Sequence, residues 1–231
     1  MKKLCLVVAL ASAMTTFGQS KFGNKPGGQF SLGIRSTTSL FSDESSTGTG
    51  FGGQFRLRFF HLLNSEWFAD YITSDIENGL GNRTDYHIGW SVMFYPSFAY
   101  RNNQRLKLQP YLLAGHCFDW STFESRDVLE RNYAERFSSA VQAGIGFHLP
   151  LHERVDFSMS GQYMIHFGEE VVVTKRSNAA GHEYLFFDTE QPEGLEGHLL
   201  VTCSLNFRIA DFWKNKVKGV QDKAPVLEEN K

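Results

Sequence analysis

Hydrophobic and polar residues alternate along several segments of the chain with a period of two. In segment 137–149 the odd-numbered positions are mainly apolar, whereas the even-numbered positions are mainly small or polar. Segments 155–167 and 199–209 repeat the pattern. Because successive side chains of a strand point to opposite faces, each segment predicts a β-strand with one apolar face and one polar face.

Five earlier segments show the same alternation less regularly, and 29–40 shows it most weakly. The full set of predicted strands is Gln29–Leu40, Phe51–Phe59, Glu66–Ser74, Tyr86–Phe94, Leu106–Trp120, Phe137–Leu149, Val155–Phe167 and Leu199–Ile209. Pro110 lies inside the fifth of them. Because proline donates no ladder hydrogen bond, we expect a bulge or a later strand start there.

The connections between these segments alternate in length. Longer polar connections are expected at 42–50, 77–84, 121–136 and 168–197, and tighter ones near 63–65, 101–104 and 150–153. Long external loops with short periplasmic turns are typical of outer-membrane barrels. The sequence therefore predicts an all-β fold, a closed antiparallel up-and-down transmembrane β-barrel of about eight strands. Within the last loop, 171–174 and 183–187 predict a hairpin above the membrane.

The N-terminus has the order of a secretory signal peptide. Met1-Lys2-Lys3 is basic, residues 4–14 are apolar, and residues 15–20 are small and polar. The apolar run is shorter than the ~20 residues of a membrane-spanning helix. We expect a signal peptide at 1–19, an outer-membrane barrel domain at 20–209 and a polar periplasmic tail at 210–231. Cys5 belongs to the signal, and Cys117 and Cys203 are too few for a disulfide scaffold.

Composition narrows the class further. After the signal no long apolar run occurs, which excludes a helical membrane protein. Removing Lys2 and Lys3 leaves 21 of the 23 basic residues against 25 acidic ones, a net charge of −4. This balance gives no sign of a nucleic-acid partner. The 21 phenylalanines are unusually many for an ordinary soluble exported protein.

These segments resemble a known family. The stretches PYLLAGHCF (110–118), SSAVQAGIGFHLPLHERVDFSMSGQYMI (138–165) and HLLVTCSLNFRI (198–209) are similar, in strand–turn–strand style and aromatic-rich last strand, to small eight-stranded outer-membrane barrels. These are the OmpX-like proteins and the OmpA transmembrane domain, within the porin-like outer-membrane barrels. The resemblance covers residues 29–209. Family members often end at an aromatic residue closing the last strand, whereas this chain continues from Ala210 to Lys231.

The resemblance implies a location and partners. A member of this family is integral to the bacterial outer membrane and contacts outer-membrane lipid and lipopolysaccharide. During biogenesis it requires periplasmic chaperones and the barrel-assembly machinery. No cofactor is implied.

An eight-stranded barrel has an interior just wide enough for side chains. Unpaired charges there are costly, so we expect the inward-facing polar residues to form a structural network that fills the lumen. The alternative is a narrow path for small solutes. The residues that parity places inside are Arg56, Arg58, Asp70, His87, Lys107, Asp119, Asp156, His166 and Arg208.

Aromatic residues near the predicted strand ends are expected to form girdles at the headgroup level. They are Trp67, Tyr71, Trp90, Phe94, Phe118, Trp120 and Phe167. A soluble lipocalin-like barrel would place its large apolar residues inside, and alternation alone does not distinguish the two arrangements. The signal peptide, the loop asymmetry and the aromatic placement favour lipid.

Residues that carry chemistry are few. A serine hydrolase needs a nucleophile and a histidine base, and the candidates are His87 with Ser91, and His166 with Glu169 or Glu170. Barrels that deacylate lipid A carry a histidine two residues before a serine followed by asparagine, and this chain has no such triplet. His148 and His152 flank a proline turn and supply too few ligands for a metal.

We therefore predict no catalytic, cofactor-binding or metal site. The predicted function is a structural and surface-interaction scaffold acting through its extracellular loops, with loop 168–197 as the place for an external partner. The alternatives are a narrow porin-like channel for small solutes, a lipid A-modifying enzyme and a soluble ligand-binding barrel.

Overall fold

The computed structural model describes residues 27–41, 47–60, 62–96, 100–101, 104–105, 108–127, 132–178, 181–190 and 197–212. The predicted signal peptide and residues 213–231 of the predicted tail lie outside the described residues. In the described part of the chain, no helix has the length and apolarity needed to cross a membrane.

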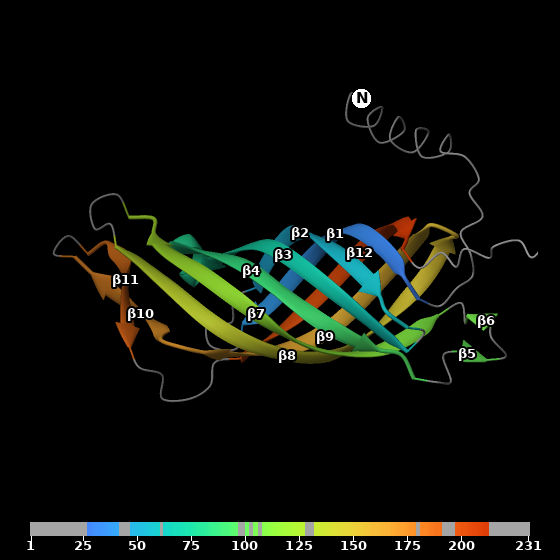
Figure 1. Ribbon diagram of the computed structural model, residues 1–231. Coiled ribbons are helices and arrows are strands. Elements are labelled where there is room, and N and C mark those ends of the chain that lie inside the picture. Colours follow the sequence, from blue (N-terminus) through green and yellow to red (C-terminus); the bar gives the residue numbers. More distant parts are fainter. Residues whose placement is uncertain are drawn as a thin grey trace, which may run out of the picture.

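Eight long strands close into a barrel (Figure 1). Each strand pairs antiparallel with its neighbours in the order β1-β12-β9-β8-β7-β4-β3-β2, and β1 pairs with both β12 and β2. The predicted all-β, eight-stranded barrel is confirmed. The strands are β1 (Gln29–Phe41), β2 (Thr47–Arg58), β3 (Leu63–Ile76), β4 (Gly81–Phe94), β7 (Gln109–Ser125), β8 (Tyr133–His152), β9 (Val155–Phe167) and β12 (Gly197–Asp211).

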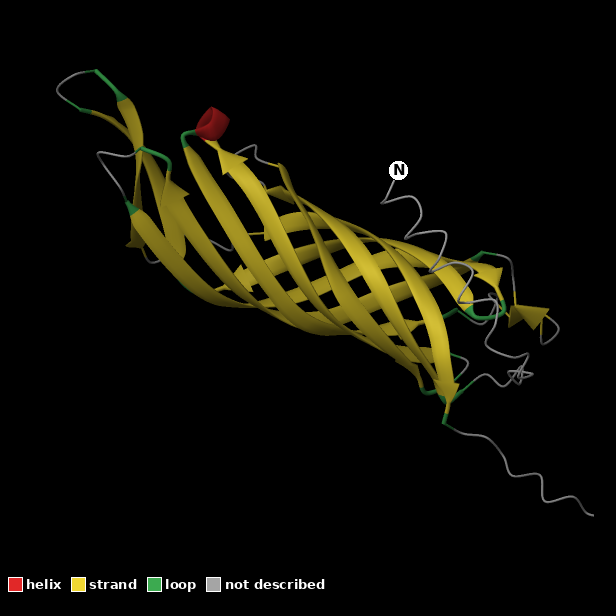
Figure 2. Ribbon diagram, turned by 90° about the horizontal axis from the view of Figure 1, so that it is seen from above, coloured by secondary structure: helices red, strands yellow, loops and turns green. Residues whose placement is uncertain are grey.

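The remaining elements lie at the two ends of the barrel. The hairpin of β10 (Glu170–Ser177) and β11 (Glu183–Glu190), which matches the hairpin expected in the last loop, lies at one end, here called the hairpin end. The short pair β5 (Tyr100–Arg101) and β6 (Gln104–Arg105) lies at the other end, here called the termini end, where β1 begins and β12 finishes (Figures 1 and 2).

Several predicted connections are wrong because the strands run further than their alternation indicates. The tight turn expected at 63–65 lies inside β3. Half of the loop expected at 77–84 and more than half of the loop expected at 121–136 are strand, and β3 joins β4 through the 3₁₀ turn η1 (Glu77–Gly79). Conversely, the connection 95–108 at the termini end is longer than predicted and contains β5 and β6. The expected difference in connection length between the two ends is therefore weaker than predicted.

The ends of two strands also differ from the prediction. Strand β7 begins at Gln109, so Pro110 is its second residue, opposite Phe147, which agrees with the later start expected there. Strand β12 includes Ala210 and Asp211, so the predicted start of the tail at residue 210 is wrong by two residues.

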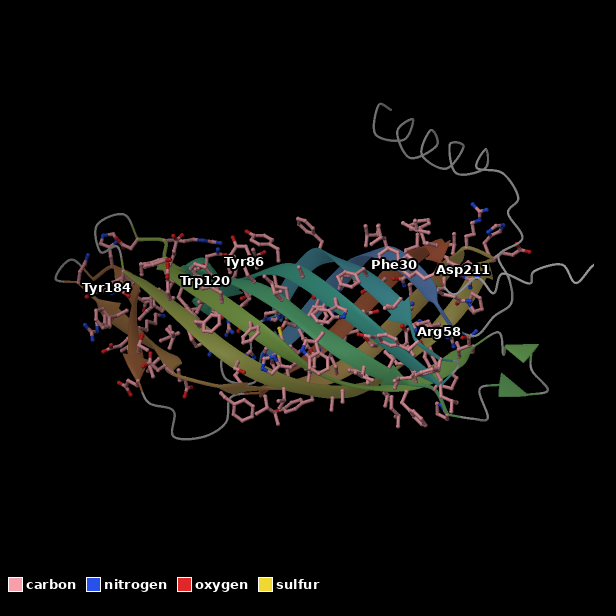
Figure 3. The ribbon with its side chains drawn as sticks, in the orientation of Figure 1. Phe30, Arg58, Tyr86, Trp120, Tyr184 and Asp211 are labelled. Carbon is pink, nitrogen blue, oxygen red and sulfur yellow. The ribbon has the colours of Figure 1, made fainter. Side chains whose placement is uncertain are left out.

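The outer wall of the barrel is apolar (Figure 3). One contiguous row of exposed aromatic side chains crosses five strands, and we call it the aromatic row: Phe51, Tyr71, Tyr86, Trp120 and Phe137. Two residues further toward the hairpin end, the same five strands carry a polar row: Thr49, Thr73, Thr84, Thr122 and Glu135. The outer surface therefore changes from apolar to polar along a defined line below the hairpin end.

Candidate functional site

The inner wall of the barrel is lined by side chains in layers, and the first layer is a chain of ion pairs. Arg56 Nη2 lies 2.8 Å from Glu66 Oε2, and Arg56 Nη1 lies 3.0 Å from Asp156 Oδ1. Arg35 Nε lies 3.0 Å from Asp70 Oδ1, and Arg35 Nη1 lies 3.6 Å from Glu66 Oε1. Glu66 thus joins the two arginines, and the lower ion-pair layer, made of these five residues, links β1, β2, β3 and β9.

Neutral polar side chains of β2, β12 and β9 continue this layer. Gln54 Nε2 donates to Asn206 Oδ1 at 2.6 Å and to Ser204 Oγ at 3.1 Å. Arg56 Nη2 also donates to Ser158 Oγ at 3.2 Å. The lower ion-pair layer and these hydrogen-bonding groups therefore connect five neighbouring strands, β9, β12, β1, β2 and β3.

A belt of apolar side chains crosses the lumen next to the lower ion-pair layer, although the inward positions were expected to be polar. Its members, here called the apolar belt, are each at most 5% exposed: Phe68, Ile72, Cys117, Ala140, Met164 and Leu200. On β3 its residues Phe68 and Ile72 flank Asp70 of the lower ion-pair layer. The Arg35 guanidinium stacks over the Phe68 ring at 4.3 Å. Gly89 makes room for that ring, since a Cβ at Gly89 would lie 2.8 Å from Phe68 Cζ.

The layer above the apolar belt is polar again, and here called the upper layer. His87 Nε2 of β4 lies 3.2 Å from Asp119 Oδ1 of β7, and Arg136 Nη2 lies 3.4 Å from Asp119 Oδ2. Arg83 Nε lies 2.9 Å from Asp85 Oδ1. Ser121 Oγ lies between the two carboxylates, 2.6 Å from Asp85 Oδ1 and 3.1 Å from Asp119 Oδ2.

Two further histidines extend the upper layer across β9 and β12. His166 Nδ1 lies 3.5 Å from Asp119 Oδ2, and His166 Nε2 lies 3.2 Å from His198 Nδ1. The His198 ring also stacks on His87 with centroids 5.8 Å apart. All three rings are at least 95% buried.

The hairpin closes the lumen at its end with a second apolar cluster. Its buried members come from both hairpin strands and from the ends of β3, β7 and β8, and we call it the closing cluster: Ile76, Phe123, Ala134, Val171, Leu185 and Phe187. On the hairpin's exposed side, Lys175 Nζ lies 2.7 Å from Glu183 Oε2. That hydrogen bond raises the pKa of Lys175.

At the termini end the lumen opens into a cavity of about 300 Å³. Four arginines line it together with Asp156 and Glu153: Arg56, Arg58, Arg154 and Arg208. Tyr95 and His148 also line it, with Tyr95 Oη 2.9 Å from His148 Nε2. The cavity is a vestibule, because the lower ion-pair layer lies directly above it.

The predicted inward residues fall into three groups. Six of them are buried on the inner wall, namely Arg56, Arg58, Asp70, His87, Asp119 and His166, and Asp156 is partly buried there. Arg208 is half-buried at the rim of the vestibule. Lys107 lies outside the described residues. Sequence reasoning missed several charged members of the layers, which parity would also have placed inside: Arg35, Glu66, Arg83, Asp85, Arg136 and His198.

The seven predicted girdle residues are 37–52% exposed on the outer wall. The rings of Trp67 and Trp90 lie 6.5 Å apart, and Tyr71 and Trp120 belong to the aromatic row. Only Phe94 and Phe167 end their strands, because the strands extend beyond the predicted bounds. The position of the seven girdle residues at the headgroup level of the membrane stays a prediction.

The candidate hydrolase residues do not form a catalytic arrangement. Ser91 Oγ accepts from Gln142 Nε2 at 2.8 Å, whereas His87 faces Asp119. The His166 ring has Ser138 Oγ at 2.8 Å and Asp119 Oδ2 at 3.5 Å on the same nitrogen, Nδ1. A triad needs its nucleophile and its acid on opposite ring nitrogens. His148 is buried and His152 exposed, so the proline turn brings no pair of ligands together.

Comparisons with known proteins identify the fold. No protein-family model and no curated protein matches the chain. Neisserial surface protein A is 11% identical over 78% of this chain and 97% of its own, with a TM-score of 0.50. A major outer membrane protein from Thermus thermophilus is 13% identical over 78% of this chain and 99% of its own, with a TM-score of 0.52. The chain therefore has the fold of the small, integral outer-membrane β-barrels, and the resemblance noted in the sequence is confirmed at that level.

The first prediction concerns the lower ion-pair layer. Glu66→Gln removes the carboxylate that joins Arg35 and Arg56, while Arg35 keeps Asp70 and Arg56 keeps Asp156 as partners. Because charge-assisted hydrogen bonds are lost, we expect the free energy of unfolding to fall by about 1.5–3 kcal/mol, measured by urea titration of the barrel in lipid vesicles. The matched control is Asp75→Asn, whose ion pair with Arg126 is more than half exposed and contributes at most about 1 kcal/mol. Equal losses in the two variants would contradict the prediction.

Proposed function

We propose that this chain is an integral protein of a bacterial outer membrane that acts as a closed scaffold and presents its hairpin end to partners outside the cell. The single observation that carries the proposal is the filled lumen. From one end to the other, the interior contains the lower ion-pair layer, the apolar belt, the upper layer and the closing cluster.

The side chains that fill the lumen argue against a channel. A hydrated ion would have to displace Glu66 and Asp70 from their arginines and then pass the apolar belt, whose residues are at most 5% exposed. Moving a charge past apolar groups that offer it no hydrogen bond costs far more than thermal energy. The vestibule at the termini end therefore does not continue through the barrel. For this reason we propose the scaffold role over the porin-like alternative.

The outer wall supports insertion into lipid. The aromatic row fits the headgroup level of one leaflet, and the polar row lies where the barrel leaves the bilayer. A membrane strand needs ~9–11 residues, whereas β7 has 17 and β8 has 20. Only 123–125 of β7 and 133–134 of β8 lie on the hairpin side of the polar row, so most of the excess length lies toward the termini end. Outer-membrane lipid and lipopolysaccharide are accordingly the partners that we propose for the outer wall.

The hairpin is the surface that we propose for an external partner. It extends beyond the barrel and exposes Lys175, Arg176 and Glu183, while Arg176 covers the Phe186 ring at 3.6 Å. The closing cluster fixes it to the barrel. Such a projecting hairpin offers both charged and aromatic contacts in a fixed orientation.

The second prediction tests insertion. Ile88 and Thr84 lie on the outer face of β4, and Ile88 is 62% exposed below the aromatic row. Ile88→Arg should lower the free energy of unfolding in lipid vesicles by about 2–4 kcal/mol, whereas Thr84→Arg, in the polar row, should cost roughly 0–1 kcal/mol. A similar loss of unfolding free energy in both variants would contradict insertion, because it would mean that the outer wall contacts water instead of lipid.

The third prediction tests which end faces outward. Lys175→Cys should react with a membrane-impermeant maleimide on intact cells, because the hairpin is exposed there. Glu153→Cys, in the turn between β8 and β9, should react only after the outer membrane is permeabilised. The parent chain, with Cys117 buried and Cys203 partly buried, sets the background. Labelling of the Glu153→Cys variant alone on intact cells would reverse the proposed orientation.

The fourth prediction tests the closed lumen. Purified protein inserted in a planar bilayer should give no steady single-channel current. A variant with 170–190 replaced by a short flexible linker should also stay silent, because the ion-pair layers and the apolar belt remain. Steady current from the parent chain would favour the channel, and current from the linker variant alone would assign the seal to the hairpin.

A further inference from the structure

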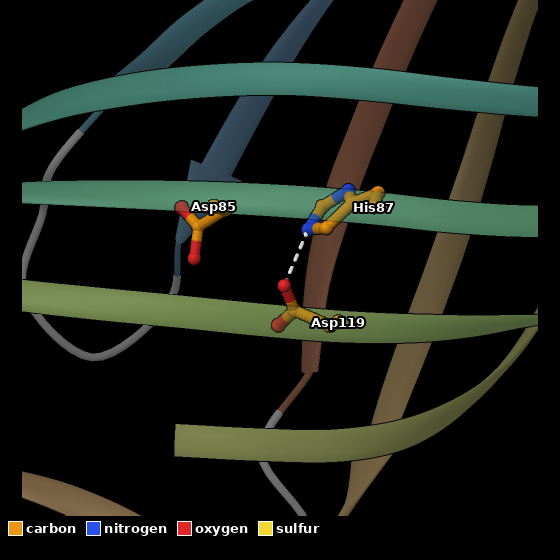
Figure 4. A group of neighbouring side chains, drawn as sticks. All are labelled: Asp85, His87 and Asp119. Carbon is orange, nitrogen blue, oxygen red and sulfur yellow. Dashed lines mark ion pairs between the residues drawn. The ribbon is translucent and has the colours of Figure 1, made fainter. Parts of the chain in front are cut away.

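We propose that the upper layer holds one divalent transition-metal ion, with Asp85, His87 and Asp119 as its protein ligands (Figure 4). One ligand atom from each residue lies within 4.8 Å of the other two. All three side chains are fully buried. The proposal does not depend on the role assigned to the hairpin.

The barrel backbone fixes these three side chains next to one another. His87 of β4 and Asp119 of β7 are directly opposite in the register, and Asp85 precedes His87 by two positions on the same face. Directly opposite residues have Cβ atoms about 4.5–5.5 Å apart. The three ligands therefore converge without a loop that must be ordered first, and the ordering cost of binding is small.

The donor atoms of His87 and Asp119 face each other, with His87 Nε2 and Asp119 Oδ1 paired at 3.2 Å, and Asp85 Oδ1 accepts from Ser121 and Arg83. His87 Nδ1 is buried and makes no hydrogen bond with the described residues. Buried polar atoms without a hydrogen bond are rare and costly, so the His87 ring is not held in place by its ion pair alone. A cation between the imidazole nitrogen and the carboxylate oxygen would accept a lone pair from each and take the place of that ion pair.

The surrounding groups hold the ligands as the outer shell of a metal site does. Arg83 contacts Asp85, and Arg136 contacts Asp119 through Oδ2, the oxygen that does not face His87. Hydrogen-bonded carboxylate ligands of this kind are usual around metal ions. The two arginines also balance the two carboxylate charges, so the layer without a metal ion carries no large excess of negative charge. Ser121 Oγ, close to both carboxylates, or a water molecule would supply the fourth position.

The donor set determines the class of ion. One imidazole with two carboxylates suits Zn²⁺, Mn²⁺, Fe²⁺ or Co²⁺, whereas Ca²⁺ and Mg²⁺ take oxygen ligands and Cu⁺ prefers thiolates. The closing cluster covers the layer on one side and the apolar belt on the other. We therefore infer an ion that enters during folding, exchanges slowly and stabilises the barrel.

The experiment uses the whole folded chain and Zn²⁺ as the probe. The protein is treated with EDTA and dialysed, and Zn²⁺ is supplied either after folding or during refolding from urea. Zinc retained per chain is measured by elemental analysis, and the temperature at which the barrel unfolds is read from heat-modifiable gel migration. Co²⁺ in place of Zn²⁺ adds a visible absorption band that reports the ligand geometry.

The expected result is one zinc ion per chain by at least one of the two routes, with a higher unfolding temperature. His87→Gln should weaken zinc binding by at least about tenfold and remove the thermal shift. Asp85→Asn gives the same test if His87→Gln fails to fold. The matched control is His182→Gln, at an exposed position of the hairpin loop, which should bind as the parent chain does.

Two results would overturn the proposal. One is a parent chain that retains no zinc by either route, which would leave the layer as an ion-pair network alone. The other is retention that is unchanged in both His87→Gln and Asp85→Asn, which would place the zinc on surface histidines.

Discussion

Closure of the sheet is the constraint on which the rest of this structure depends. A strand at bilayer depth has no water to satisfy its backbone groups, so each must pair with a neighbour. The pairing of β1 with β12 removes the last two edges. Once eight strands close, the radius is fixed and the interior admits only side chains. The outer positions must then be apolar, and the inner positions must fill a narrow space.

The filled interior follows from that narrow radius. Charges that point inward lose most of their water, and they are stable only where a partner lies within reach. Glu66 meets this requirement by contacting both Arg35 and Arg56, so three strands share one carboxylate. Removing either arginine leaves a carboxylate behind without its arginine partner, which makes the layer an interdependent unit. Such a unit also favours one register of the strands, because a shift by one residue would turn every charge toward lipid.

The sequence predicts which face of the barrel wall a residue occupies better than it predicts which side chains that residue contacts. Alternation placed Arg56, Asp70 and Asp119 inside because parity is a local property of a strand. It did not reveal that Arg35 contacts Asp70, since those residues lie two strands apart and meet only when β1, β2 and β3 pair in register. The layers of the interior depend in the same way on how different strands are aligned along the barrel axis. The sequence of a single segment does not contain that information.

The apolar belt shows where a local signal was present but was not used. Phe68 and Leu200 occupy inward parity in segments whose other inward residues are polar, and both are buried. A large apolar residue at such a position has no lipid to contact, so it must meet others like it inside. The closing cluster differs, because Leu185 and Phe187 belong to a hairpin outside the barrel. No alternation within a membrane strand predicts that contact.

The closing cluster also explains how a small barrel can present a defined surface. A free loop loses conformational entropy when it binds a partner, whereas a hairpin already packed in place loses less at that moment. Here Val171, Leu185 and Phe187 bury their side chains against Phe123 and Ile76 of the barrel rim. The same contacts that seal the lumen therefore fix the orientation of the exposed charges above it. The closing cluster therefore accounts both for the filled end of the lumen and for the defined surface that the hairpin presents.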